Sequence, residues 1–141
     1  MSFYLDTSVV VAAFTNEART ADCQQWIREH QAAPLTVSEW VWVEFTAAIG
    51  AKARLQTITE PTKERAAAMY SAFLTGGMLS FGVGPNDFSY AAELADRAPV
   101  GLRGADALHL AIASRRGATL CTLDKKQAEA GVSLGLATLL L

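Results

Sequence analysis

The chain opens with FYLDTS at residues 3–8, the stretch that decides the fold. Residues 3–5 form a short apolar run rich in aromatics, which is typical of a β-strand. Asp6 follows this run directly, and residues 9–14 are again apolar. We therefore predict a strand, a turn and a helix here, with Asp6 at the carboxyl end of the strand.

Short apolar runs and helical segments continue to alternate along the chain. Further strands are predicted at residues 34–37, 78–83, 119–122 and 136–141. Further helices are predicted at 20–31, 39–54, 105–116 and 124–130, and Ser38 is the expected N-cap of the helix at 39–54. Another helix is predicted to open at 59–61 and to end at Gly76, and one more to follow the turn at 84–87 and to reach residue 97. A loop is predicted at 99–104. Alternating strands and helices require parallel crossovers, so the expected fold class is α/β: a three-layer α/β/α sandwich with a central, mainly parallel sheet of about five strands. Because there is no repeat, low-complexity tract or linker, residues 1–141 are expected to form a single domain.

The composition is that of a folded chain with little net charge. Apolar residues make up 51% of the 141 residues and charged residues 18%, which excludes an intrinsically disordered protein. Twelve basic residues against 14 acidic ones give a formal net charge of −2. A strongly cationic protein that binds nucleic acid without specificity is therefore not expected.

The two cysteines and the N-terminal residues favour a cytoplasmic location. Cys23 and Cys121 lie far apart and form no CxxC pair, so they are expected to be buried and reduced. The first residues contain no basic leader. No run approaches the ~20 apolar residues that cross a bilayer, so no membrane partner is expected.

Four acidic residues stand where a solvated surface does not explain them. Asp6 and Asp124 lie at the carboxyl ends of predicted strands, and Asp106 is in the first turn of the most apolar helix. Glu44 is flanked by large apolar residues in the stretch WVWVEF at 40–45. In open parallel sheets, sites form beyond the carboxyl ends of the strands. We therefore expect the four carboxylates to converge at that edge of the sheet.

Converging carboxylates repel one another unless a cation holds them, and an unpaired buried carboxylate is costly. Oxygen ligands with room for water suit Mg²⁺ or Mn²⁺ rather than Zn²⁺. Without these four charges the rest of the chain carries a formal +2, which is compatible with an anionic substrate. Thr7, Ser8 and Thr122 are supporting candidates because their hydroxyls can donate to ligand carboxylates or to water, although turns and caps use the same residues.

Each acid also has a structural explanation that the sequence leaves open. Asp6 and Asp124 can serve as helix caps, and Asp106 can interact with the helix dipole. Glu44 has the weakest such explanation, because acids in the middle of a helix are normally solvated. A purely structural role is easy to accept for any one of these acids, but much less expected for all four together.

Other polar and aromatic residues have two interpretations each. His109 shares a helix face with one of the acids, and it is either a structural or substrate-side residue or a metal ligand. The basic pairs at 115–116 and 125–126 flank the expected site, where they can meet phosphates or lie in solvent. Trp40 and Trp42 fit packing in the core or a dimer interface better than base stacking.

Two other enzyme classes fit the sequence less well. A phosphatase of the haloacid dehalogenase type also begins with a strand-end Asp but needs a second Asp two positions later, where Ser8 stands. A receiver domain of a response regulator carries its acids in a different order. Motifs GxGxxG and GxSxG and a P-loop are absent, so a nucleotide cofactor and serine hydrolysis lack support.

The chain resembles the PIN-domain family in four motifs that occur in order. They are YLDTSV at 4–9, VEF at 43–45, GADALHLA at 104–111 and TLD at 122–124. Together with the length and the element order, they extend the resemblance over essentially the whole chain. The subgroup that the chain resembles most is the VapC-type toxins of bacterial toxin–antitoxin pairs.

This resemblance implies a Mg²⁺-dependent (or Mn²⁺-dependent) endoribonuclease that hydrolyses RNA phosphodiester bonds. It also implies a homodimer and a small antitoxin protein that inserts into the active-site groove. The implied catalytic and metal-binding residues are Asp6, Glu44, Asp106 and Asp124. A non-catalytic module of the same fold, acting as a binding scaffold, is the alternative.

The chain departs from the family at one place. Many relatives carry another Asp or Asn just beyond the last acid, whereas Lys125 and Lys126 stand here. The resemblance therefore does not imply a fully occupied second metal site.

Overall fold

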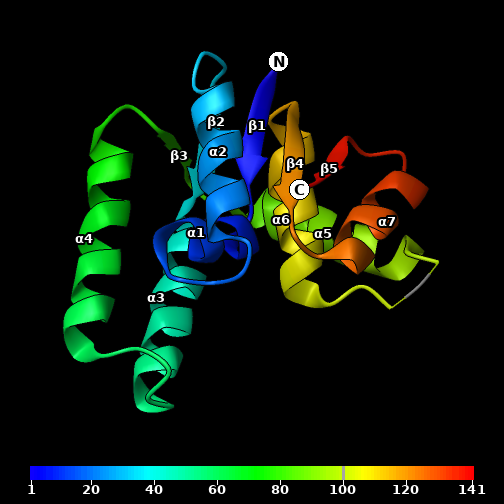
Figure 1. Cartoon of the computed structure of the whole chain (residues 1–141). Coiled ribbons are helices and arrows are strands. Elements are labelled where there is room, and N and C mark those ends of the chain that lie inside the picture. Colours follow the sequence, from blue (N-terminus) through cyan, green and yellow to red (C-terminus); the bar gives the residue numbers. More distant parts are fainter. Residues whose placement is uncertain (100) are drawn as a thin grey trace.

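A computed structural model describes residues 1–99 and 101–141 and contains seven helices and five strands (Figure 1). In chain order the elements are β1 (Ser2–Leu5), α1 (Thr7–Phe14), α2 (Thr20–His30), β2 (Leu35–Ser38), α3 (Glu39–Arg54), α4 (Glu60–Thr75), β3 (Leu79–Phe81), α5 (Pro85–Arg97), α6 (Gly104–Arg115), β4 (Ala118–Thr122), α7 (Lys125–Ser133) and β5 (Thr138–Leu140). The predicted α/β fold class, with a central parallel sheet of five strands between helices, is confirmed.

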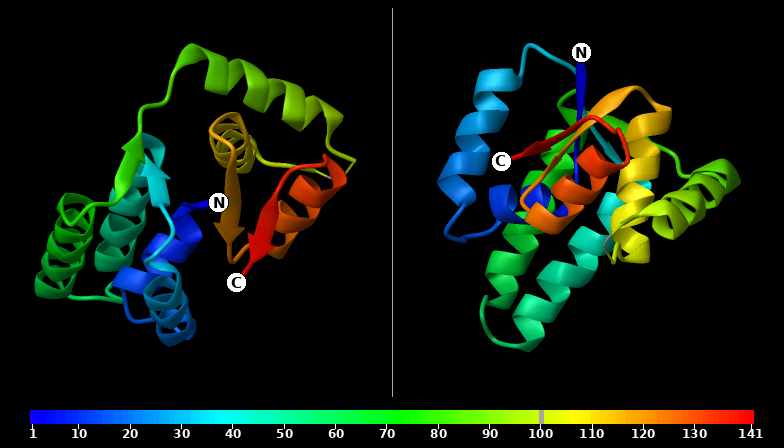
Figure 2. Two further views of the ribbon diagram at one scale, coloured as in Figure 1. Left: turned by 90° about the horizontal axis from the view of Figure 1, so that it is seen from above. Right: turned by 90° about the vertical axis from the view of Figure 1, so that its right-hand side faces the viewer.

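The sheet has the strand order β3-β2-β1-β4-β5, and all four neighbouring pairs are parallel. The chain moves outward from β1 to β3 and then returns to β4 on the other side of β1. Right-handed crossovers then place α1 to α4 on one face and α5 to α7 on the other, as the left view of Figure 2 shows. The strand order therefore reverses between β1 and β4, the kind of position where α/β sheets bind ligands.

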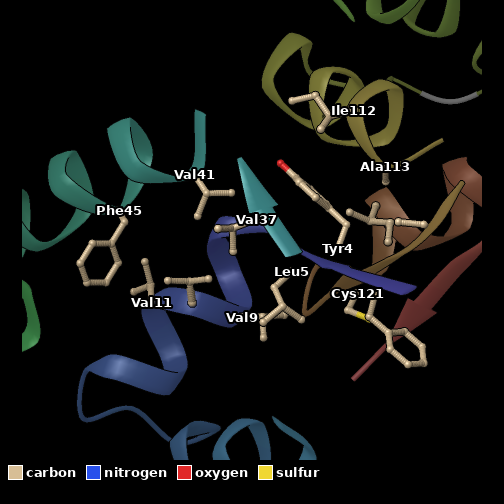
Figure 3. Close-up of a cluster of buried hydrophobic side chains, with 14 of the residues drawn as sticks. Tyr4, Leu5, Val9, Val11, Val37, Val41, Phe45, Ile112, Ala113 and Cys121 are labelled. Carbon is tan, nitrogen blue, oxygen red and sulfur yellow. The ribbon is translucent and has the colours of Figure 1, made fainter. Parts of the chain in front are cut away.

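The central strand β1 is buried on both faces. Tyr4 and Leu5 are completely buried and point to opposite sides of the sheet (Figure 3). Leu5 lies near Val9 of α1, whereas Tyr4 points toward the side on which α6 packs. Burying these large side chains holds the end of β1, and with it Asp6, in a fixed place.

The bounds of several predicted segments differ in the structure. The strand predicted at 78–83 covers only Leu79–Phe81, because it pairs with residues 36–38 and β2 ends at Ser38. The carbonyl of Gly82 instead accepts a hydrogen bond from Arg116 Nη2 at 2.7 Å. The helix predicted at 124–130 continues to Ser133, and the last strand is limited to Thr138–Leu140. The predicted loop at 99–104 includes residue 100, which lies outside the described residues, and Gly104 already begins α6.

In the part of the chain that the structure describes, no helix has both the length and the apolar character needed to span a membrane.

Candidate functional site

Asp6 lies directly after β1 and is only 4% exposed. Its Oδ1 caps α1 by accepting from Val9 N at 3.2 Å and also accepts from the Ser8 hydroxyl at 2.6 Å. Its Oδ2 lies 2.6 Å from the Thr122 hydroxyl at the end of β4. Burial raises the pKa of Asp6, although these hydrogen bonds and the nearby His109 act in the opposite direction.

Thr122 joins the ends of the two central strands. Its Oγ1 accepts from the backbone N–H of Asp124 at 2.9 Å and lies within 2.7 Å of two acceptors, Asp6 Oδ2 and Gln127 Oε1. A hydroxyl has one proton, so it can donate to only one of these acceptors at a time. The carboxyl ends of β1 and β4 thus meet in one buried hydrogen-bonded group, as the parallel register predicts.

Asp124 and Asp106 face each other across one guanidinium group. Arg103 Nε donates to Asp106 Oδ2 at 3.0 Å, and its Nη2 donates to Asp124 Oδ2 at 3.2 Å. The Arg103 side chain is 78% exposed, whereas those of Asp106 and Asp124 are 19% and 30% exposed. The two acids are therefore partly buried, and the cation that neutralises them comes from the solvent side.

Glu44 reaches the site from α3 and is held by two other elements. Its Oε2 accepts from the Thr7 hydroxyl and lies 2.6 Å from Nε2 of the buried His109. Burial alone raises the pKa of Glu44, but the hydrogen bond and charge of His109 outweigh that effect, so the pKa lies below its ordinary value. Among the described residues Glu44 forms no hydrogen bond to the other three acids. Its partners are Thr7, the residue after Asp6, and His109, which lies on the same helix as Asp106.

Asp6 and Asp124 each cap a helix with one carboxylate oxygen and leave the other oxygen for contacts within the site. Asp124 Oδ1 caps α7 by accepting from Lys126 N at 2.9 Å and Gln127 N at 3.2 Å, while its Oδ2 faces Arg103. Asp6 divides its two oxygens in the same way, between α1 and Thr122. One oxygen of each carboxylate therefore fixes the side chain and the other is turned toward the neighbouring groups.

The donors of this site fit a hard divalent cation in their chemistry. All the acidic candidates offer carboxylate oxygens, and hydroxyls lie beside them, as Mg²⁺ and Mn²⁺ prefer. Within residues 1–99 and 101–141, however, no three acidic, histidine or cysteine side chains are grouped closely enough to hold an ion. The Arg103 guanidinium stands between two of the carboxylates, and its exposed side chain is free to turn toward solvent.

A small pocket opens beside these carboxylates. It has a volume of about 360 Å³, and its lining includes Arg103, Asp106, Asp124, Lys126 and Gln127. Lys126 thus lies beside the carboxylates, as the prediction that residues 125–126 flank the site requires. An anionic group that enters here meets two cationic side chains next to the acids.

The expectation that Arg115 and Arg116 flank the site is wrong. Both lie at the carboxyl end of α6, the opposite end from Asp106, because α6 runs antiparallel to the strands. Their guanidinium groups bind Asp87 at 3.0 and 2.6 Å. These arginines therefore fasten α5 to α6 and have no part in the site.

The two tryptophans next to Glu44 differ in their surroundings. Trp40 packs against the core, whereas Trp42 is 42% exposed. The Trp42 ring stacks on Tyr70 with the ring centroids 5.4 Å apart. Trp40 is therefore a partly buried residue that packs on the core, and Trp42 is more exposed.

Sequence reasoning missed Arg103 and the partners of His109. Arg103 stands three residues before Asp106, a spacing that allows ion pairing at the start of a helix and was a usable signal. The contact of His109 with Tyr4 joins residues 105 positions apart, which no local pattern reveals. Gln127, which contacts Thr122, was likewise not expected.

The PIN domain family matches residues 3–132 of the chain. No curated protein sequence gives a significant match. Among solved structures, VapBC2 from Rickettsia felis bound to a promoter DNA fragment superposes with a TM-score of 0.72 at 17% identity, covering 99% of this chain and 98% of that one. FitAcB from Neisseria gonorrhoeae also gives 0.72 at 17% identity, covering 98% and 96%.

A third similar structure is VapC20 from Mycobacterium tuberculosis, described as a toxin that cleaves the sarcin–ricin loop. It has a TM-score of 0.70 at 18% identity and covers 92% of this chain and 95% of that one. At such identities the similarity establishes a shared fold over nearly the full length of both chains.

Proposed function

The chain belongs to the PIN domain family, and from that premise we propose that it is a metal-dependent endoribonuclease. The reaction is hydrolysis of an RNA phosphodiester bond by water. The proposed catalytic and metal-binding residues are Asp6, Glu44, Asp106 and Asp124.

The observation that carries this proposal is the contact between the ends of β1 and β4. Asp6 and the segment that begins with Thr122 come from opposite ends of the chain, yet Asp6 Oδ2 and Thr122 Oγ1 lie 2.6 Å apart. The buried Asp6 gains no helix-capping benefit from that second oxygen. A costly buried carboxylate at a switch point of the sheet is better explained by function than by stability.

The proposed ligands are mainly Asp6 and Asp106, with Asp124 and Glu44 in support. A bound Mg²⁺ or Mn²⁺ supplies acidification of water and neutralisation of charge on the phosphate. The chain itself supplies orientation, because Ser8 and Val9 N fix one oxygen of Asp6. Lys126, at the rim of the pocket, is placed to attract the RNA backbone.

We further propose that the protein is the toxin of a toxin–antitoxin pair and works in the cytoplasm as a homodimer. The similar structures from Rickettsia felis and Mycobacterium tuberculosis support the toxin–antitoxin part of this proposal, since they are a VapBC2 assembly and the toxin VapC20. The cognate antitoxin would be a small protein. Co-purification with the product of a small adjacent reading frame, and light scattering of the isolated protein, test the two assemblies.

A cleavage assay on single-stranded RNA tests the activity. Purified protein should cut the RNA with Mg²⁺ or Mn²⁺, and EDTA should stop the reaction. Because water is the proposed nucleophile, the products should carry no 2′,3′-cyclic phosphate, which attack by the ribose 2′-hydroxyl would leave. Failure to bind Mn²⁺ and to cut RNA would instead identify a non-catalytic binding module of the same fold.

Replacing Arg103 with Gln is expected to strengthen Mn²⁺ binding by roughly fivefold, which corresponds to the free energy of an exposed ion pair. The substitution removes the guanidinium that pairs with Asp106 and Asp124, so the ion no longer has to displace it. Isothermal titration calorimetry measures the affinity. Arg97→Gln, at the exposed end of α5, is the matched control and should leave the affinity unchanged. Weaker binding in Arg103→Gln would show that Arg103 does not compete with the ion.

A further inference from the structure

We propose that His109 is a positioning residue whose buried imidazole fixes the orientation of Glu44 and joins β1, α3 and α6 to one another. Its effect on catalysis depends on the function proposed above, whereas its structural part can be tested without any activity. The contacts of the ring carry the inference.

Both ring nitrogens of His109 have specific partners. The residue is 3% exposed, with Nε2 2.6 Å from Glu44 Oε2 and Nδ1 2.9 Å from the Tyr4 hydroxyl. An ionised carboxylate only accepts hydrogen bonds, so the proton must be on Nε2. Burial raises the pKa of Tyr4, which therefore keeps its hydroxyl proton and can donate it to Nδ1. Nε2–H thus donates to Glu44, while Nδ1 and the Tyr4 hydroxyl share the second hydrogen bond of the ring.

The same network determines which oxygen of Glu44 is available. Thr7 donates to Oε2, the oxygen that also meets His109. With both donors on Oε2, the other oxygen, Oε1, accepts none of the hydrogen bonds formed among the described residues and can meet a water molecule or an ion. Without the imidazole, the carboxylate would lose its buried partner and could rotate away, since the Glu44 side chain is 22% exposed.

The contacts of His109 close a ring through the fold. The Tyr4 hydroxyl also lies 2.7 Å from Ser38 Oγ, and Ser38 is the N-cap of α3, the helix that carries Glu44. A path from Ser38 through Tyr4 and His109 to Glu44 therefore starts at the N-cap of α3 and ends on α3 itself. Such a ring restrains α3 relative to both β1 and α6.

Each restrained element brings an acid to the site. Asp6 follows β1, Glu44 belongs to α3, and Asp106 lies on α6 three residues before His109. The imidazole is the part of the ring that touches one of these carboxylates directly. Groups that orient metal-binding carboxylates and histidines in this way typically change affinity or activity by 10- to 100-fold.

Proton NMR tests the contact itself. The chain has two histidines, so the imidazole resonances can be assigned by comparing His109→Gln with His30→Gln. The Nε2 proton of a buried imidazole held by a carboxylate should exchange slowly and resonate far downfield. We expect a resonance of His109 that is kept in His30→Gln and lost or strongly shifted in Glu44→Ala. Its absence from the parent, or its persistence unchanged in Glu44→Ala, overturns the proposal.

Kinetics of RNA cleavage separate positioning from simple support of the fold. His109→Ala should lower kcat by 10- to 100-fold with little change in KM. His109→Gln should recover kcat to within about fivefold, since its amide nitrogen can replace Nε2 as a donor to Glu44. His30→Gln should match the parent. Parental kcat in His109→Ala, or a folded His109→Gln as impaired as His109→Ala, overturns the positioning role.

Failure of the proposed function gives a different result. If the parent itself neither binds Mn²⁺ nor cuts RNA, the nuclease assignment is wrong, while the NMR comparison still decides whether His109 holds Glu44. If the parent cuts RNA and the His109 variants cut it at the same rate, the nuclease assignment is supported and the positioning role of His109 is wrong.

Discussion

Asp6→Asn is expected to reduce RNA cleavage by at least about 100-fold while leaving the thermal midpoint equal to or above that of the parent. Asn removes a carboxylate oxygen that the proposed ion needs. It also removes a buried charge. Burial raises the pKa of Asp6, so the ionised carboxylate stabilises the folded chain less than the neutral form does. Initial cleavage rates and thermal unfolding in EDTA measure the two effects.

Hydrogen bonding supports the expected stability of Asp6→Asn. The Asn oxygen can replace Oδ1 as acceptor for Val9 N and the Ser8 hydroxyl, and the Asn amide can donate to Thr122 Oγ1. The Thr122 proton is then free for Gln127 Oε1, which lies at 2.7 Å. The ionised parent lacks a proton for one of these contacts.

Asp22→Asn is the matched control for this prediction. It makes the same chemical change on α2, where the Asp22 side chain is 66% exposed and pairs only with Arg19 in the described chain. We expect parental cleavage in that variant. Full activity in a folded Asp6→Asn protein would refute the assignment of the acidic site.

The part of the site that follows from strand ends was predictable. In a parallel sheet the carboxyl ends of all strands share one edge, so the positions of Asp6 and Asp124 after two apolar strands placed them together. The structure agrees, since β1 and β4 are neighbours and Asp6 contacts Thr122. Periodicity and strand–helix order were sufficient for this inference.

Contacts made across the layers were not predictable from the sequence. Whether Arg103 turns toward Asp124 depends on the path of the chain after α5, which local patterns do not determine. The meeting of His109 with Tyr4 depends on how α6 crosses the sheet. These contacts depend on how the layers pack, so the composition of the chain and the spacing of its residues do not predict them.

The misplacement of Arg115 and Arg116 has a different cause. A helix between parallel strands runs back along the sheet, so its carboxyl end lies at the amino end of the strands. Applied to residues 105–116, that rule would have removed both arginines from the site. Nearness in sequence to Asp124 was the misleading signal.

Asp87→Ala is expected to lower the free energy of unfolding by about 3 kcal/mol and the thermal midpoint by about 10 °C. Asp87 is 2% exposed and accepts from Arg115 Nε at 3.0 Å, from Arg116 Nη1 at 2.6 Å and from Gly84 N at 2.9 Å. Ala would leave these donors without their shared acceptor and would loosen the start of α5 from the end of α6. Urea unfolding at pH 7 measures the loss.

The pH dependence of this contribution provides its sharpest check. The hydrogen bond from Arg116 lowers the pKa of Asp87 from its ordinary 3.8 to about 2, against the opposing effect of burial. A carboxyl group with a lowered folded-state pKa stabilises the fold above its unfolded pKa and loses that effect as pH falls. The difference in unfolding free energy between parent and Asp87→Ala should therefore be constant above about pH 5 and should shrink by about 2 kcal/mol between about pH 4 and pH 2. Asp96→Ala, on the exposed side of the same helix, should match the parent throughout, and a difference for Asp87→Ala that stays constant down to pH 2 would show that the ionised carboxylate is not the stabilising group.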